Sequence, residues 1–261
     1  MPNGSLDALL FSKTPDSKPL SWDQRYNIIS RVASALNYLH NEYDQKVVHR
    51  DLKAGNIMLD FDFNARLGDF GLARALDKEK TSYSEVKGVA GTLGYIALEC
   101  FLTGKATQQS DVYAFGVVLL EIVCGLRTGT RIGEFCFLVN WVWSLHREGH
   151  ILDAVEERIG DECVVEEAKK VLILALACCH PIASGRLRTQ AIVHIISDSK
   201  IMTDFGLPIA LDEEKILSPE AGGVAGTLGH VVPECFLTGK ATKQPDVYAF
   251  GVVLWEIVCR L

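Results

Sequence analysis

The amino-acid sequence predicts a mostly helical protein of the α+β class. Apolar residues recur at the three-to-four-residue spacing of buried helix faces in several stretches of residues 1–197. Only residues 47–72 combine short β-favouring runs with polar turns, which indicates a functional loop region rather than core. Hydrophobic residues make up 48% and charged residues 23% of the 261 residues, a composition that fits a folded globular chain and excludes a disordered one.

The first long helix is predicted to begin after Ser21. Ser21 and Gln24 have the spacing of a capping box, in which each side chain accepts a hydrogen bond from the backbone of the other residue. The apolar residues that follow lie on one face of a helix of about five turns. They are Ile28, Ile29, Val32, Ala35, Leu36 and Leu39.

A second helix is predicted to begin at Ser110-Asp111 and to be buried at the centre of the fold. Residues 112–124 are almost continuously apolar, and a helix that is apolar on all sides is a buried one. Gly125 is the expected stop. Further helices are predicted over residues 139–145, 168–179 and 189–196.

Charge and hydropathy exclude two classes of function. The net charge is −7, from 26 Lys and Arg against 33 Asp and Glu, so a nucleic-acid partner is not expected. The longest wholly apolar run, Val171 to Cys179, has nine residues and is too short to insert into a bilayer. Residues 1–5 do not resemble a secretory signal, and the eight cysteines lack zinc-ligand spacing. We therefore expect a cytoplasmic chain with reduced thiols.

Part of the sequence is repeated. Residues 69–124 align without gaps on residues 204–259, and 40 of the 56 aligned residues are identical. Solenoid repeats have periods of about 20–50 residues and at least three copies, so this pattern indicates a partial duplication instead. The sequence predicts a body over residues 1–197 and a partial repeat over 198–261. Residues 112–123 already fill the place that the helix predicted over 247–258 would need, so we expect the repeat to dock poorly.

The most specific motif lies in the predicted loop region. His49-Arg50-Asp51-Leu52-Lys53-Ala54-Gly55-Asn56 is followed, thirteen residues after Asn56, by Asp69-Phe70-Gly71. Gly91-Thr92-Leu93-Gly94-Tyr95 and Ala97-Leu98-Glu99 come next in the chain. In this order and spacing, the motifs resemble the catalytic loop, metal-binding loop and activation segment of protein kinases.

Longer segments resemble the plant receptor-like serine/threonine kinases, and in particular the L-type lectin-domain receptor kinases. They are residues 110–121, 138–143 and 176–181, together with 188–193 and the start of the chain at 1–6. The resemblance implies that residues 1–197 form a protein-kinase-like C-lobe without the N-terminal β lobe. We find no counterpart of the family's Gly-rich loop, strand lysine or helix glutamate, so the resemblance also implies weak ATP binding and little autonomous activity.

The resemblance implies roles for the motif residues in phosphoryl transfer from Mg-ATP to a protein substrate. Asp51 would accept or orient the proton of the acceptor hydroxyl, and Lys53 would neutralise charge on the transferred group. Asn56 and Asp69 would hold Mg²⁺ through oxygen ligands. The Asp-Leu-Lys order of residues 51–53 is similar to that of serine/threonine kinases.

Other residues are expected to control or support this site. Arg50 would pair with a phosphorylated residue of the activation segment, in which Thr81, Ser82, Tyr83 and Ser84 carry hydroxyl groups. Thr92 would form a hydrogen bond near Asp51. The resemblance implies structural roles for the remainder: His49 against Phe70, Asp111 as a tether of the catalytic loop, and Glu99 paired with Arg186.

Three interpretations stay open at this point. The chain is a serine/threonine kinase that uses Mg-ATP, an inactive module that binds protein substrates or kinase partners, or a non-functional remnant of a rearranged gene. The intact catalytic-loop motif favours the first. The missing nucleotide-side motifs favour the second, and the degenerate repeat favours the third.

Overall fold

The computed structural model describes residues 1–12, 19–75, 82–84 and 91–198, with only the backbone considered for 82–84. The partial repeat lies outside these residues, as do the helix predicted over 247–258 and Thr81. The poor docking of the partial repeat and the division of the chain into residues 1–197 and 198–261 therefore stay predictions.

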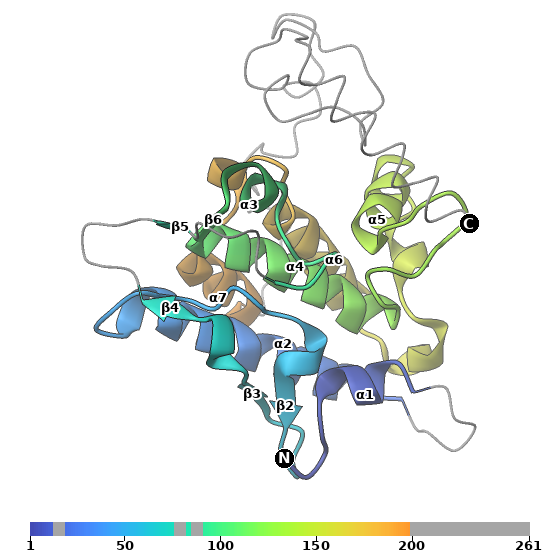
Figure 1. Ribbon diagram of the computed structural model, residues 1–261. Helices are drawn as coiled ribbons and strands as arrows, with labels where there is room; N and C mark the ends of the chain where they lie inside the picture. The colour runs from blue at the N-terminus through green and yellow to red at the C-terminus, as the bar shows by residue number, and fades with distance from the viewer. Residues whose placement is uncertain (13–18, 76–81, 85–90, 199–261) are drawn as a thin grey trace, which may run out of the picture. The chain divides into compact units, whose positions relative to one another are not determined.

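The described residues are mostly helical, which confirms the predicted class (Figure 1). The helices are α1 (Leu6–Leu10), α2 (Trp22–Asn37), α3 (Leu98–Thr103), α4 (Gln108–Cys124), α5 (Leu138–Arg147), α6 (Val165–Cys178) and α7 (Thr189–Ser197). The strands form antiparallel pairs: β1 (Val47–Val48) with β4 (Arg74–Ala75), β2 (Ile57–Leu59) with β3 (Ala65–Leu67), and β5 (Ser82–Ser84) with β6 (Lys105–Thr107).

Helix α4 forms the centre of the hydrophobic core and contacts α2, α5 and α6 (Figure 1). Nearly all of its side chains are buried, as predicted for a helix without a polar face. A Cβ at Gly116 would lie 2.7 Å from Cys179 Sγ and 2.8 Å from Ala175 O, so this glycine allows α4 and α6 to approach closely. Gly125 ends the helix with φ +62°, which confirms the predicted stop.

The start of α4 differs from the prediction. The helix begins at Gln108 with Thr107 as its N-cap, not at Ser110. The amide of Ser110 donates to Thr107 Oγ1 at 3.2 Å, and the Ser110 hydroxyl accepts from the Thr107 amide at 3.0 Å. Ser110 is therefore the third helical residue of a capping box rather than its cap.

Helix α2 begins as predicted, with the complete capping box of Ser21 and Gln24. Its apolar face, with Ile28, Val32 and Leu36 buried, packs against β3, α4 and α7. The chain then continues into a π-helical turn over Tyr38–Glu42, which carries His40 into the protein interior.

The expectation that residues 47–72 lie outside the core is wrong for part of this stretch. Val48, Leu52, Ala54, Ile57 and Leu59 are all 0–1% exposed. Alternate residues of a short strand point to opposite faces, so β2 buries Ile57 and Leu59 while Met58 between them is half-buried. The motif residues are thus held on segments anchored in the core.

The predicted helices over residues 139–145, 168–179 and 189–196 correspond to α5, α6 and α7. None of the helices in the described part of the chain is both long and apolar enough to cross a membrane. The six cysteines within that part are all free thiols.

Candidate active site

The β2–β3 hairpin brings the end of the catalytic-loop motif, at Asn56, next to the Asp-Phe-Gly motif that starts thirteen residues later, at Asp69. Ile57 pairs with Leu67, so Asn56 and Gly68 face each other just beyond the ends of the strands. The Gly68 amide donates a hydrogen bond to the Asn56 carbonyl at 2.8 Å. Asp69 follows directly, with φ +56°, and its side chain accepts from the Gly71 amide at 3.3 Å. The end of the catalytic loop and the Asp-Phe-Gly motif are therefore neighbours.

Asp51 lies at the centre of a network of polar side chains. Lys53 Nζ donates to Asp51 Oδ2 and to Thr92 Oγ1, each at 2.8 Å. The Thr92 hydroxyl donates to Asp51 Oδ1 at 2.7 Å. Asn56 Nδ2 completes the network with bonds of 2.8 Å to Asp51 O and 3.1 Å to Asp51 Oδ2. Both carboxylate oxygens of Asp51 thus accept hydrogen bonds.

These contacts determine the ionisation of Asp51, which is 9% exposed. Burial alone would raise the pKa of its carboxyl group. Hydrogen bonds from Lys53 and Thr92, the charge of Lys53 and the hydrogen bond from Asn56 together outweigh burial, so the pKa of Asp51 lies below its ordinary value. Asp51 is therefore an anion at neutral pH.

A second buried carboxylate fixes the backbone before Asp51. Asp111 Oδ2 accepts from the His49 amide at 2.7 Å, and Asp111 Oδ1 accepts from the Arg50 amide at 2.9 Å. His40 Nε2 also donates to Asp111 Oδ2, at 3.0 Å. Arg50 has φ +73°, a left-handed conformation that costs free energy in a residue other than glycine. The hydrogen bonds from the His49 and Arg50 amides to Asp111 hold the chain in this conformation.

His49 connects the catalytic loop to the Asp-Phe-Gly motif. Its Nε2 donates to the Gly68 carbonyl at 3.0 Å, and its ring centroid lies 5.0 Å from that of Phe70. The Phe70 side chain is still 46% exposed, and Asp69 is exposed as well. This part of the site therefore presents a carboxylate and an aromatic ring to solvent.

The donor atoms of Asn56 and Asp69 suit a hard cation such as Mg²⁺. The Asn56 amide nitrogen is used by Asp51, which leaves its side-chain oxygen for a metal. Asp69 adds an exposed carboxylate on the neighbouring turn. Across the described residues no group of three or more His, Cys, Asp or Glu side chains could hold a metal ion.

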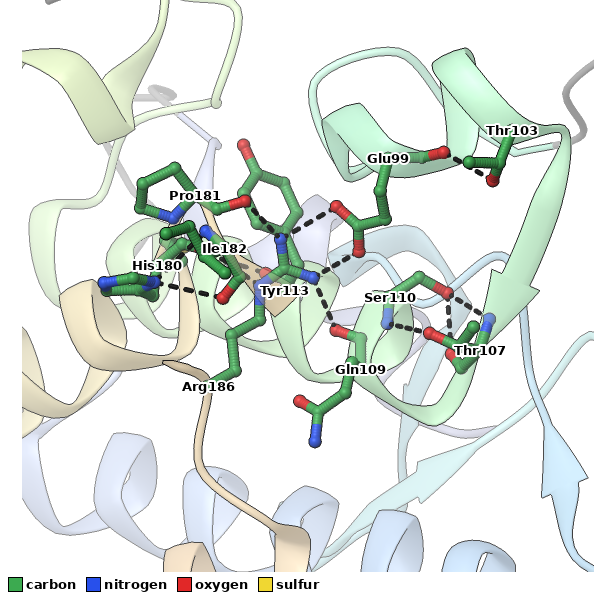
Figure 2. A network of polar contacts seen from close by, with 11 residues as sticks. Glu99, Thr103, Thr107, Gln109, Ser110, Tyr113, His180, Pro181, Ile182 and Arg186 are labelled. Atoms are coloured by element: carbon green, nitrogen blue, oxygen red, sulfur yellow. Dashed lines mark hydrogen bonds and ion pairs between the residues drawn. The ribbon is translucent and has the colours of Figure 1, made fainter. Parts of the chain in front are cut away.

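An ion pair anchors the segment that leads from Thr92 into α3 (Figure 2). The guanidinium of Arg186, buried against α4, binds both Glu99 carboxylate oxygens, at 2.5 and 2.9 Å. It also donates to the backbone carbonyls of His180 at 2.7 Å and Gln109 at 3.0 Å, and its carbon Cζ lies 5.1 Å from the centre of the Tyr113 ring. Arg186 thereby joins α3, α4 and the chain after α6.

The structure places Arg50 but not the side chains of the activation segment that it is predicted to bind once phosphorylated. Arg50 Nη1 donates to the Leu72 carbonyl at 3.3 Å. Thr81 lies outside the described residues, and Ser82 and Ser84 are placed only as backbone partners of β6. The pairing of Arg50 with a phosphorylated residue stays a prediction.

A pocket opens beside Asp51 on the side of the activation segment. Its lining includes Asp51, Thr92, Tyr95, Cys100 and Lys105. It lies between the catalytic loop, the Thr92–Tyr95 turn, α3 and β6, and Asp51 is part of its lining.

Sequence reasoning missed three residues of this region. His40 follows Leu36 by about one helical turn, lies in the π-helical turn that continues α2, and binds Asp111. Tyr95 donates to Glu121 Oε2 at 2.7 Å. Glu121 could have been found, because it is the sole charged residue within the apolar run 112–124.

Curated plant proteins are similar to most of this chain. The probable L-type lectin-domain containing receptor kinase S.5 of Arabidopsis thaliana is 44% identical over 203 residues, and the probable kinase S.7 of the same type and plant is 46% identical over 202 residues. The L-type lectin-domain containing receptor kinase SIT1 of Oryza sativa subsp. japonica is 44% identical over 199 residues. The alignments cover 75–76% of this chain but only 29–31% of each relative.

The same relationship is found at the level of the family. The sequence profile of the family described as protein tyrosine and serine/threonine kinase matches residues 1–196, and it matches again over residues 187–260, which include the partial repeat. The first match contains every residue of the Asp51 network. The chain therefore belongs to the protein tyrosine and serine/threonine kinase family.

Proposed function

We propose that this chain contributes the C-lobe of a protein serine/threonine kinase of the plant receptor-like type, which transfers phosphate from Mg-ATP to a protein hydroxyl group. The observation that carries the proposal is the network around Asp51. The ionised carboxylate of Asp51 lies 2.8 Å from the ammonium group of Lys53 and 3.1 Å from the amide nitrogen of Asn56, whose side-chain oxygen, like the carboxylate of Asp69, suits Mg²⁺.

Asp51 would act on the acceptor hydroxyl. Its lowered pKa keeps the carboxylate ready to accept a hydrogen bond from a serine or threonine of the substrate. The bond from Thr92 to Oδ1 and the bonds from Lys53 and Asn56 to Oδ2 fix the orientation of the carboxylate, so that little reorganisation is needed when the acceptor binds.

Lys53 would stabilise the charge of the transferred group. Its ammonium group is 2.8 Å from Asp51 and is about one-quarter exposed, so a phosphate oxygen beside Asp51 could also reach it. Mg²⁺, held by Asn56 and Asp69, would neutralise charge on the nucleotide phosphates.

The protein substrate would bind on the side of the activation segment. The pocket next to Asp51 and Thr92 opens there, and the Glu99–Arg186 pair fixes the segment that follows it. Support for this part of the proposal is geometric: a hydroxyl group entering the pocket would approach Asp51 from the side of Thr92.

The test is phosphate transfer from labelled Mg-ATP, by the purified chain, to itself and to a basic generic substrate. The variant Asp51→Asn removes the charge from the network. The matched control is Asp62→Asn, because Asp62 is exposed in the β2–β3 turn, at the opposite end of the hairpin from Asn56. We expect slow transfer by the wild type and by Asp62→Asn, and a loss of at least about 100-fold in Asp51→Asn. Equal and measurable transfer by all three proteins would refute the role of Asp51.

One observation favours a second candidate, an inactive module that binds protein substrates or kinase partners. On the proposed substrate side, the ion pair of buried Arg186 with Glu99 holds α3 against α4. On the proposed nucleotide side, Phe70 and Asp69 are exposed. For this candidate, the wild type would transfer no more phosphate than Asp51→Asn and would not bind Mg-ATP in calorimetry, yet would bind a protein partner. Binding of Mg-ATP would count against it.

A further inference from the structure

The core helix α4 has a near-identical copy in the partial repeat. Residues 107–125 run from the N-cap of α4 to the glycine that ends it, and we call them the first copy; residues 242–260 are the second copy. The second copy lies outside the described residues and is compared by sequence alone. The two copies differ at four of 19 positions. Lys243, Pro245, Trp255 and Arg260 stand where the first copy has Gln108, Ser110, Leu120 and Gly125.

So similar a sequence is a competitor for the place of α4 in the core. The second copy keeps Asp246, which corresponds to Asp111, the residue that holds the backbone before Asp51. It also keeps Gly251, which corresponds to Gly116 at the close contact with α6. Molecules that share an element can exchange it, as in domain swapping. Whether the second copy can replace α4 therefore depends on the four positions that differ.

The first incompatible position lies at the start of the helix. The Ser110 amide donates to Thr107 Oγ1 at 3.2 Å, and the Ser110 hydroxyl accepts from the Thr107 amide at 3.0 Å. Proline has neither an amide hydrogen nor a hydroxyl group, so Pro245 can form neither bond of this capping box. The neighbouring difference is milder. Gln108 Nε2 donates to the His40 carbonyl at 2.6 Å, and the ammonium group of a lysine can also donate there.

The second incompatible position lies in the middle of the helix. Leu120 is 0% exposed and follows Gly116 by four residues, so both lie on the same face of α4. On that face α6 leaves no room even for a methyl group, since a Cβ at Gly116 would be 2.8 Å from Cys178 Cβ. An indole ring is far larger than the side chain of leucine, and a close-packed core takes it only by displacing its neighbours. Trp255 therefore does not fit at the place of Leu120.

The third incompatible position lies at the end of the helix. Gly125 has φ +62°, and a Cβ there would overlap the carboxylate of Glu156. That carboxylate is 7% exposed and forms ion pairs with Arg25, which is 1% exposed, and with Arg158. It cannot turn aside without leaving the buried charge of Arg25 unpaired. Arg260 at this place would also add a further positive charge beside Arg25 and Arg158.

We propose that the core site of α4 accepts only the first copy, because Pro245, Trp255 and Arg260 prevent the second copy from entering it, within one chain or in another molecule of the chain. The three residues correspond to the start, middle and end of α4, so each part of the helix rejects the second copy. The carboxylate that holds the backbone before Asp51 is then always that of Asp111. The inference concerns packing alone and does not depend on the proposed function.

The first test places the residues of the second copy into α4 of the full chain and follows thermal unfolding by circular dichroism. We expect Leu120→Trp and Gly125→Arg each to lower the melting temperature by at least about 4 °C. Both changes together with Ser110→Pro should lower it by at least about 10 °C or prevent folding. The matched control is the fourth difference, Gln108→Lys, with an expected change below about 2 °C. A triple variant as stable as the wild type would overturn the inference.

The second test restores the residues of the first copy in the second, with Pro245→Ser, Trp255→Leu and Arg260→Gly in one chain. The protein is unfolded in urea and refolded at high concentration, and its mass is measured by size-exclusion chromatography with light scattering. We expect the wild type to refold as a monomer. The restored chain should also form a dimer that disappears when residues 242–261 are deleted. Lys243→Gln, which leaves all three incompatible residues in place, is the matched control and should stay monomeric.

Hydrogen exchange of residues 107–125, measured by mass spectrometry on the same samples, also detects replacement within one chain. A first copy that is displaced from the core loses its protection from exchange. We expect full protection in the wild type and partial loss in the restored chain. Loss of protection in the refolded wild type would mean that the second copy enters the core as it stands. A restored chain with neither a dimer nor a loss of protection would mean that these three residues are not what excludes it. Either result overturns the inference.

Discussion

Replacing Arg186 by methionine would remove the charge that joins α3, α4 and the chain after α6, while keeping most of the side-chain length. Arg186 is fully buried, and the substitution leaves the carbonyl oxygen of His180 without this donor, whereas the carbonyl oxygen of Gln109 keeps its bond within α4. A buried acceptor left unpaired costs about 1 kcal/mol. Glu99 loses both of its bonds but is 24% exposed, so water offsets part of its loss and about 1 kcal/mol remains. We expect Arg186→Met to lower the free energy of unfolding by about 2 kcal/mol.

The assay is urea unfolding at pH 7, followed by tryptophan fluorescence and circular dichroism. The matched control is Arg66→Met, because Arg66 is exposed on β3, and we expect a change below about 0.5 kcal/mol there. In a double-mutant cycle, Arg186→Met and Glu99→Gln together should cost less than the sum of their separate effects by about 1–2 kcal/mol. A loss below 1 kcal/mol in Arg186→Met, or strict additivity in the cycle, would refute the assignment of this pair as an anchor.

Three further predictions concern packing, pH and the repeat. Gly116→Ala should lower the free energy of unfolding by about 1–3 kcal/mol, because there is no room for a methyl group between α4 and α6. Gly129 has open space around it, so Gly129→Ala should be tolerated, and equal effects of the two substitutions would contradict the packing argument. Burial raises the pKa of Glu121 from 4.5 to about 7, so its contribution to stability is fully present below pH 4.5 and is lost as pH rises through 7. In urea titrations, the free energy of unfolding of the wild type relative to Glu121→Gln should fall by about 3 kcal/mol over this pH range. A difference that does not change with pH would contradict burial of the charge. Deleting residues 199–261 should change the melting temperature by less than about 2 °C, and a larger fall would mean that the repeat docks on the body.

The fold could be predicted from the sequence where local patterns determine it. The capping box of Ser21 and Gln24 marks the start of α2, and Gly125 after the apolar run marks the end of α4; each signal consists of residues that are neighbours in the chain. Helices α1 and α3, of five and six residues, were not predicted because so short a segment shows less than two helical turns of periodicity. The start of α4 was misplaced because Thr107 and Ser110 both favour a cap, and only the observed hydrogen bonds distinguish them.

The residues of the candidate site could be named from the sequence, but most of their contacts could not. The resemblance of residues 49–56 to the kinase catalytic loop singled out Asp51, Lys53 and Asn56, since a motif is a local pattern. The bond between His40 and Asp111 joins residues 71 positions apart and depends on how α2 packs near α4. The same holds for Tyr95 and Glu121, 26 positions apart. Such pairs are fixed by tertiary packing, which a single sequence does not display.

The carboxylate of Asp111 has a consequence for the dynamics of the catalytic loop. Amide hydrogens exchange with solvent only when their hydrogen bonds open, and the acceptor of the His49 and Arg50 amides lies on the most deeply buried helix. Fraying of the loop must therefore break two hydrogen bonds to a carboxylate that the core helix holds in place, so we expect these two hydrogens to exchange more slowly than those of the exposed β2–β3 turn. The loop that carries Asp51 is thus expected to stay ordered while less well anchored segments open.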